Sequence, residues 1–146
     1  MILKTTIPLV QPDEVAKYLP QQAPFIMVDT LWGVSLTGAI SGFTVSLNNI
    51  LVDDGYFQES GIVENIAQTI ALKAGYEAAK RQQKPQVGFI VMVKNVVIFD
   101  LPSVGEELKT TIEITMNFQD MLVIIGNSFV GDKAIASCEM RVFLEK

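Results

Sequence analysis

Residues 61–81 repeat apolar side chains with the spacing of an α-helix, and this segment constrains the fold most strongly. Its main stripe recurs at every fourth position and consists of Ile62, Ile66, Ile70, Ala74 and Ala78. Residues four apart lie on one face of a helix, and further small or apolar residues widen this face. We therefore predict a helix of about 20 residues that is buried on most sides. The rest of the chain must supply an apolar surface around it.

The ends of this helix carry typical boundary residues. Ser60 or Gly61 can act as the N-cap, and Glu64 falls in the first turn, where a carboxylate meets the positive end of the helix dipole. Three cations gather near the other end: Lys80, Arg81 and Lys84. Pro85 follows them and ends the helix.

The segments on both sides of the helix are rich in β-branched and aromatic residues. Before the helix, residues 25–34 and 39–47 predict a hairpin, and residues 12–19 predict a short helix. After the helix, strands are predicted over residues 87–99, 106–118, 121–130 and 133–144. A buried helix between a leading hairpin and a trailing antiparallel meander predicts an α+β hotdog fold, in which a curved sheet wraps around the helix. We expect residues 1–146 to form one such domain.

Residues 87–99 form an apolar segment that can leave an exposed edge strand. Pairing this edge with a second copy would satisfy its free backbone groups, so we expect a homodimer or a higher homo-oligomer. Hydrophobic residues make up 49% of the chain and charged residues 18%, which is more apolar than a small solitary domain requires. The surplus is expected in a subunit interface or a ligand pocket.

Composition excludes several classes of function. The net charge of -5 disfavours a grip on nucleic-acid phosphates. Cys138 is the only cysteine and the chain has no histidine, which excludes disulfides, Ser-His and Cys-His pairs and most zinc sites. We therefore predict no metal site and no cofactor. Residues 1–11 lack the features of a signal peptide, and no apolar stretch approaches membrane-spanning length, so we expect a cytoplasmic protein without a membrane span.

Three stretches, in the right order along the chain, resemble the 3-hydroxyacyl-[acyl-carrier-protein] dehydratases. Residues 19–29, Leu-Pro-Gln-Gln-Ala-Pro-Phe-Ile-Met-Val-Asp, are similar to the family's Leu-Pro-His-Arg-x-Pro-Phe-Leu-Leu-Val-Asp. Residues 64–68, Glu-Asn-Ile-Ala-Gln, are similar to Glu-Ala-Leu-Ala-Gln on the family's central helix. Residues 104–108, Val-Gly-Glu-Glu-Leu, resemble its Pro-Gly-Asp-x-Leu turn into a strand. The resemblance implies the same hotdog fold and an acyl thioester as ligand.

One motif of that family is missing. Its Gly-His-Phe-Pro sequence has no counterpart here, because only residues 58–63 separate Phe57 from Glu64. The shortened loop also resembles the dehydratase-like hotdog proteins encoded with aryl-polyene lipid pathways. In the dehydratases the histidine removes the C2 proton while the helix carboxylate protonates the leaving hydroxyl. Glu64 matches that carboxylate, so the resemblance implies a site whose dehydration is slow or absent without histidine.

The candidate site residues lie at the start of the long helix. We predict Glu64 as the catalytic acid or base. The alternative is that its negative charge only complements the positive end of the helix dipole. Gln68, one turn later, orients Glu64 or a thioester, or else is a surface amide. The backbone N–H groups of Gly61 and Ile62 can receive a thioester oxygen. Asp29 is interpreted as structural in a turn, and Cys138 as a small core residue.

Three functions stay open at this point. The first is a dehydratase-like protein, a lyase, that binds a 3-hydroxyacyl thioester of acyl-carrier protein or coenzyme A in fatty-acid or polyene-type lipid synthesis. The second is an acyl thioesterase in which Glu64 activates water. The third is a non-catalytic partner subunit of an active dehydratase. Cations at the helix C-terminus can meet an acidic carrier protein, but dipole complementarity is the favoured interpretation for them.

Overall fold

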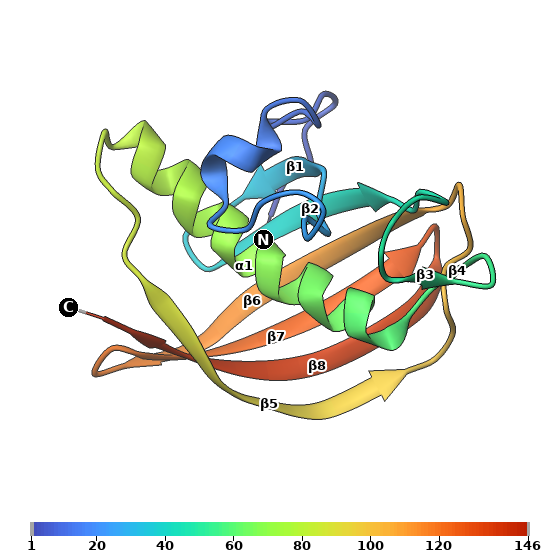
Figure 1. Cartoon of the computed structure of the whole chain (residues 1–146). Helices are drawn as coiled ribbons and strands as arrows, with labels where there is room; N and C mark the ends of the chain where they lie inside the picture. The colour runs from blue at the N-terminus through green and yellow to red at the C-terminus, as the bar shows by residue number, and fades with distance from the viewer. Residues whose placement is uncertain (1, 146) are drawn as a thin grey trace.

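The computed structural model describes residues 2–145 and has one long helix packed in a curved antiparallel sheet (Figure 1). The helix α1 spans Glu59–Lys80. The sheet has six strands in the order β1-β2-β6-β7-β8-β5. Their bounds are β1 (Thr30–Val34), β2 (Gly38–Thr44), β5 (Gly88–Ile98), β6 (Glu107–Phe118), β7 (Met121–Val130) and β8 (Lys133–Leu144). This is the α+β arrangement predicted from the sequence.

The inner face of the sheet buries alternate side chains against α1. Strand β7 shows the pattern, since Leu122 and Ile124 are buried while Val123 between them is only partly covered. Ile66 of the helix fills the space above Gly126, where an added Cβ would collide with its side chain. The buried core also includes Ile62, Leu72, Leu108, Ile112, Met140 and Val142. The long apolar face of the helix is therefore buried by the sheet, as its periodicity predicts.

A chain of buried polar side chains joins the helix to the sheet beneath it. The Thr110 hydroxyl on β6 donates to Asn65 Oδ1 at 2.6 Å and lies 2.7 Å from the Ser128 hydroxyl on β7. Thr69 and Ser41 pair in the same way at 2.7 Å. All five residues are buried with their polar groups satisfied. Such a network fixes the rotation and height of the helix more sharply than apolar packing alone.

The segments before the helix differ from the prediction. Residues 25–29 are not part of a strand, because residues 25–27 hydrogen-bond to helix side chains instead of to a neighbouring strand. The Ala23–Pro24 peptide in this stretch is cis. The predicted helix over residues 12–19 is only a 3-10 turn, η1 (Val15–Tyr18). A small hairpin, β3 (Val52–Asp53) with β4 (Tyr56–Phe57), was not predicted.

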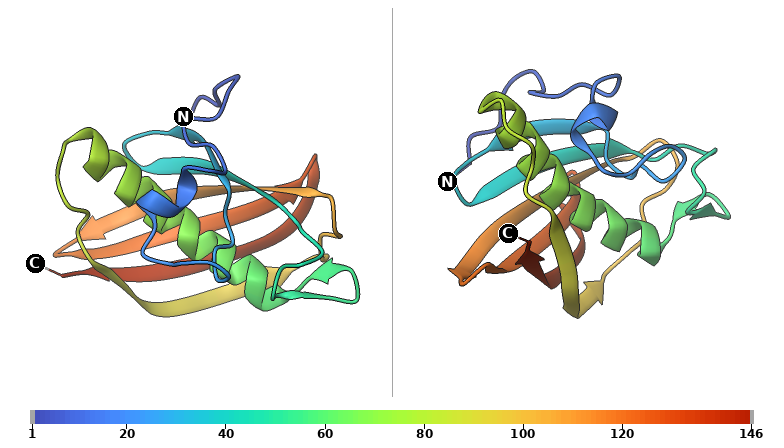
Figure 2. Two further views of the ribbon diagram at one scale, coloured as in Figure 1. Left: turned by 45° about the horizontal axis from the view of Figure 1, so that its top comes forward. Right: turned by 60° about the vertical axis from the view of Figure 1, so that its left-hand side comes forward.

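The two edges of the sheet are unlike each other (Figure 2). The N-terminal segment covers β1, because the N–H groups of Thr5 and Leu9 donate to Trp32 and Leu31 at 2.9 and 2.7 Å. Strand β5 pairs only with β8, and no other described segment lies along its free side. Its apolar side chains are exposed on both faces, with Phe89 at 52% and the adjacent Ile90 at 44%. The exposed edge strand that the sequence predicts over residues 87–99 is therefore present as β5.

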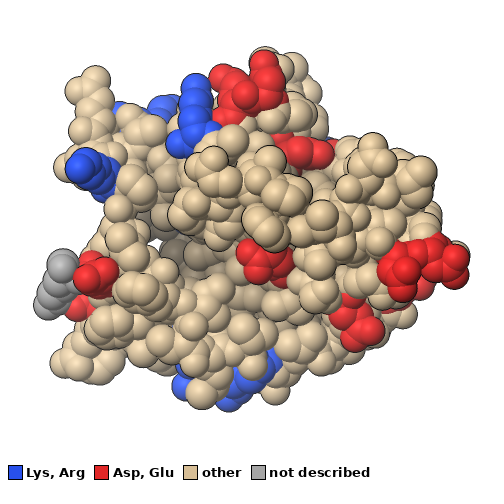
Figure 3. All heavy atoms as spheres, viewed as in Figure 1, with Lys and Arg blue, Asp and Glu red and all other residues tan. Residues whose placement is uncertain are grey.

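Charged side chains stand in small separate groups on the face shown in Figure 3, and uncharged atoms cover most of that face. Within residues 2–145, no helix is long and apolar enough to cross a bilayer. The same part of the chain contains no cluster of three or more acidic or cysteine side chains suited to a metal ion.

Candidate functional site

Glu64 lies at the mouth of an apolar cavity beside the first half of α1. The cavity has a volume of about 380 Å³. It is lined by Phe25, Met27, Ile50, Leu51, Ser60 and Glu64. Ser60 and Glu64 are four residues apart on the helix and supply its polar side chains, while the loop residues supply its apolar wall. The site therefore joins one ionisable group to a space suited to a hydrocarbon chain.

Gln68 holds Glu64 in place from one turn further along the helix. Its Nε2 donates to Glu64 Oε1 at 3.0 Å and to the Phe25 carbonyl at 2.8 Å. Its Oε1 accepts the Met27 N–H at 2.7 Å. Gln68 is fully buried, so the interpretation as a surface amide is wrong. The other Glu64 oxygen, Oε2, has no hydrogen-bond partner within residues 2–145, which leaves it free for a ligand.

The wall segment at residues 25–27 is attached to the helix by side chains. Asn65 Nδ2 donates to the Met27 carbonyl at 2.8 Å, and Gln68 bonds both Met27 and Phe25. Asn49 also donates to the Met27 sulfur at 3.3 Å. Two amides of α1 thus replace the backbone ladder of a strand here, and they set the width of the cavity that Glu64 faces.

The start of α1 differs from the predicted anion site. The helix begins at Glu59 with Gln58 at the N-cap, and the Ile62 N–H donates to the Gln58 carbonyl at 3.1 Å. Ile62 therefore cannot offer this group to a substrate, and its side chain lies in the core. Gly61 is buried beneath the Phe57 ring, where an added Cβ would collide, while its own N–H donates to no backbone acceptor in the described chain.

Ser60 lines the cavity one turn before Glu64. The sequence predicts it as a possible N-cap, but Gln58 occupies that position in the structure. The available signal in the sequence is the i, i+4 spacing of Ser60 and Glu64, which places both on one face of the helix. A helix start two residues earlier than predicted moved Ser60 inside the helix and hid its role.

Two further candidates are structural. Asp29 accepts the Thr44 N–H at 2.8 Å and the Thr30 hydroxyl at 3.1 Å, which ties β1 to the end of β2. Burial raises the pKa of Asp29 above its ordinary value, although these hydrogen bonds oppose the rise. Burial also raises the pKa of the Cys138 thiol to about 11, so this residue is an inert core side chain.

Comparison with known proteins identifies the family of the chain. Residues 13–146 match the family model described as ApeP-like, the ApeP dehydratase. The dehydratase heterocomplex ApeI:P from Xenorhabdus doucetiae is similar, with 18% identity, a TM-score of 0.80 and coverage of 96% of this chain and 92% of that chain. The uncharacterized protein PH1136 from Pyrococcus horikoshii has 10% identity, a TM-score of 0.70 and coverage of 97% and 96%.

Thioesterase-like structures are also similar in fold. A hypothetical thioesterase with coenzyme A from Streptococcus pneumoniae TIGR4 has 10% identity, a TM-score of 0.61 and coverage of 75% of this chain and 79% of that chain. Curated protein sequences give no match. The structural likenesses confirm the hotdog fold, and the match over nearly the whole sequence establishes that the chain belongs to the ApeP-like dehydratase family.

Proposed function

We propose that this protein binds a 3-hydroxyacyl thioester of acyl-carrier protein in the cavity beside Glu64, as a dehydratase-like component of fatty-acid or polyene-type lipid synthesis in the cytoplasm. The observation that carries the proposal is the Glu64 carboxylate, fixed by Gln68 with one oxygen unpartnered at an apolar cavity of about 380 Å³. An acyl chain fits the wall of Phe25, Met27 and Leu51, and its polar end reaches Glu64.

The chemistry of dehydration limits what this site does alone. The reaction removes a proton from C2, protonates the hydroxyl on C3 and releases it as water, leaving a double bond between C2 and C3. Two proton transfers are needed, and the chain has no histidine to share them with Glu64. We expect the isolated chain to dehydrate its substrate slowly or not at all.

The free edge of the sheet supports the interpretation as a partner protein. Strand β5 presents a free apolar edge, and a neighbouring strand placed there would satisfy its backbone groups. The related ApeI:P structure is a heterocomplex of dehydratase subunits. We propose that β5 pairs with another subunit, a second copy of this chain by default, and that a histidine-containing dehydratase subunit is the alternative.

An acyl thioesterase is the second candidate function, and it is supported by the position of Glu64 in the lining of the cavity. A carboxylate at the mouth of an acyl cavity can activate water against a thioester carbonyl. The Gly61 N–H, which donates to no backbone acceptor in the described chain, is the group left at the helix start to receive the developing oxyanion. Hydrolysis would release a free thiol and a carboxylic acid.

The test is an assay of two products with one matched variant. The full chain is incubated with a 3-hydroxyacyl-carrier-protein thioester, alone and with a histidine-containing dehydratase subunit, while enoyl product and free thiol are followed. Binding of the same thioester is measured by titration. Glu64→Gln removes the charge at the cavity, and Glu59→Gln makes the same change on the exposed first turn of α1.

Each outcome selects one function. Enoyl formation lost in Glu64→Gln but kept in Glu59→Gln supports dehydration, and thiol release with that pattern supports hydrolysis. Thioester binding weakened only by Glu64→Gln, with enoyl product appearing only beside the second subunit, supports the partner role. Thioester that does not bind, or that binds equally well to all three proteins, overturns the proposal for Glu64.

A further inference from the structure

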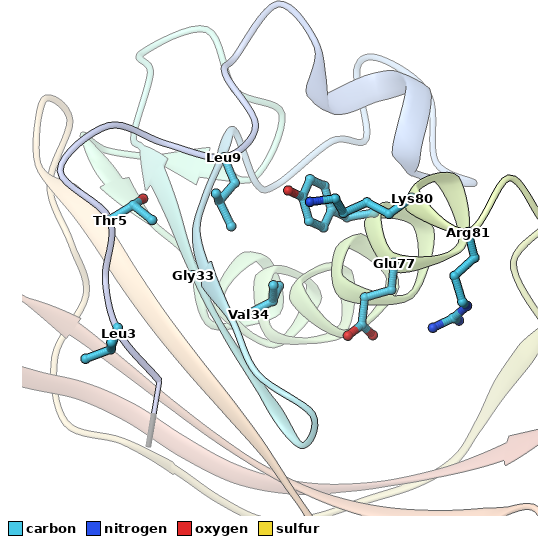
Figure 4. Close-up of a pocket in the computed structure, with 9 residues that line it drawn as sticks. Leu3, Thr5, Leu9, Gly33, Val34, Glu77, Lys80 and Arg81 are labelled. Carbon is cyan, nitrogen blue, oxygen red and sulfur yellow. The ribbon is translucent and has the colours of Figure 1, made fainter.

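A second cavity lies beside the C-terminal end of α1 (Figure 4), whereas Glu64 lies near the start of the helix. It has a volume of about 450 Å³ and is lined by Leu3, Thr5, Leu9, Gly33, Val34, Tyr76, Glu77, Lys80 and Arg81. Glu64 and Glu77 are roughly 20 Å apart along the helix, at a rise of about 1.5 Å per residue. The two cavities share no lining residue, so the second one is a separate site.

The charge at this cavity is unbalanced in favour of cations. Lys80 and Arg81 line it, and within residues 2–145 neither has an acidic partner within ion-pair distance. Glu77 is the acidic residue of the lining, but Lys73 neutralises it through an ion pair of 2.6 Å. The chain as a whole carries a charge of -5, so this pair of cations is opposite in sign to the net charge of the protein.

The helix dipole accounts for only part of this arrangement. Lys84 lies beyond the same helix end and does not line the cavity, whereas Lys80 and Arg81 do. The Lys80 ammonium also lies 5.4 Å from the centre of the Tyr76 ring. Dipole complementarity requires a cation near the last turn, but it does not require an apolar cavity beside that cation.

The wall opposite the cations is apolar and closely fitted. Leu3 and Leu9 come from the N-terminal segment, and Val34 comes from the end of β1 (Figure 4). Gly33 lets the two segments approach, because a Cβ there would lie 2.8 Å from the Leu3 carbonyl oxygen. The hydrogen bonds of Thr5 and Leu9 to β1 hold this wall in place.

We propose that this cavity binds a small organic anion with an apolar tail. The head group, a carboxylate or a phosphate, meets the Lys80 ammonium beside the Tyr76 ring, and the tail packs against Leu9 and Val34. The Arg81 side chain points away from Lys80 and adds positive charge to the rim of the cavity (Figure 4). The Lys80 ammonium can donate a charge-assisted hydrogen bond to either head group, and the positive charge of Arg81 strengthens the attraction of the anion to this rim. The inference does not depend on the reaction at Glu64.

The test uses decanoate and the ¹⁵N-labelled full chain, followed by amide chemical shifts. Saturable shifts are expected at the amides of Gly33, Val34 and residues 76–81, with little change at residues 60–68. Acetate lacks the tail and decyltrimethylammonium reverses the charge, so both are expected to bind far more weakly. A parallel titration with decyl phosphate identifies the preferred head group.

Three charge-neutralising variants complete the experiment. Lys80→Gln and Arg81→Gln are each expected to weaken decanoate binding by about three- to tenfold. Lys84→Gln makes the same charge change beside the cavity and is expected to leave binding unchanged. Equal binding by Lys80→Gln and Lys84→Gln, equal binding of decyltrimethylammonium, or shifts confined to residues 60–68 would overturn the proposal. Circular dichroism of each variant confirms that it is folded.

Discussion

The side-chain amide of Gln68 donates a hydrogen bond of 3.0 Å to Glu64 Oε1, one helical turn earlier on α1. The orientation of this amide is fixed, because its own oxygen accepts the Met27 N–H at 2.7 Å and its nitrogen also serves the Phe25 carbonyl. An inverted amide would oppose all three partners. One buried side chain therefore sets both the wall of the cavity and the position of its carboxylate.

Gln68→Leu is expected to lower the free energy of unfolding by about 2–4 kcal/mol, because it removes the partners of the buried Met27 N–H and of the part-buried Phe25 carbonyl. Urea denaturation measures the change. Gln83→Leu, at an exposed amide beyond the helix, is expected to stay within about 0.5 kcal/mol of the wild type. Similar losses in the two variants would contradict the role of Gln68.

Gly75→Ala is expected to destabilise the protein, opposite to the usual effect of this change in a helix. Replacing glycine by alanine in an exposed helix interior normally stabilises by about 1 kcal/mol. Here the new Cβ would collide with the Tyr18 carbonyl oxygen, a backbone atom that cannot rotate away. We expect a loss of about 1–3 kcal/mol in thermal or urea unfolding. A raised melting temperature would show that η1 does not lie against the helix as described.

Val91→Lys is expected to separate subunits without unfolding them. Val91 is 55% exposed on the free edge strand β5, and a lysine on an edge opposes strand pairing. Leu36→Lys is the matched control, because Leu36 is 90% exposed in the turn between β1 and β2. Light scattering of the eluted protein should show a smaller mass for Val91→Lys alone. A mass unchanged in both variants would place the subunit contact elsewhere.

Cys138 is expected to react with iodoacetamide only when the protein unfolds. Burial raises the pKa of its thiol from an ordinary value of 9.0 to about 11, so at pH 8 the thiolate fraction falls about a hundredfold in the folded state. The protonated thiol favours folding below about pH 9, and this stabilisation is lost as the pH rises through 11. Mass spectrometry of the alkylated protein, with and without urea, measures the difference. Rapid labelling without urea would contradict burial.

The strands after the helix follow closely from sequence, and the segments before it do not. Strands β6, β7 and β8 alternate buried and partly covered positions over most of their length, and the bounds predicted from the sequence agree with the structure to within one residue. Residues 25–29 have the same apolar composition as a strand. The backbone groups of Phe25 and Met27 in this stretch bond instead to the side chains of Asn65 and Gln68. These residues are distant in sequence, and a local sequence pattern does not predict such a long-range hydrogen bond.

The candidate site was predicted in part for the same reason. Glu64 and Gln68 stand at helical spacing, so their pairing can be read from the chain. Gly61 and Ile62 depended on the first residue of the helix, and a start at Glu59 engages the Ile62 N–H in the helix itself. Helix ends carry weak sequence signals, because capping by Gln58 involves no side-chain hydrogen bond here.

The unequal edges of the sheet limit how far copies of this chain can associate through their strands. Because the N-terminal segment occupies β1, each molecule has β5 as its available strand for edge-to-edge addition in the described chain. Two molecules joined by a twofold axis through β5 consume both available strands, and nothing remains for a third. Association through β5 would therefore stop at two molecules and would keep a highly apolar sheet from extending into fibres.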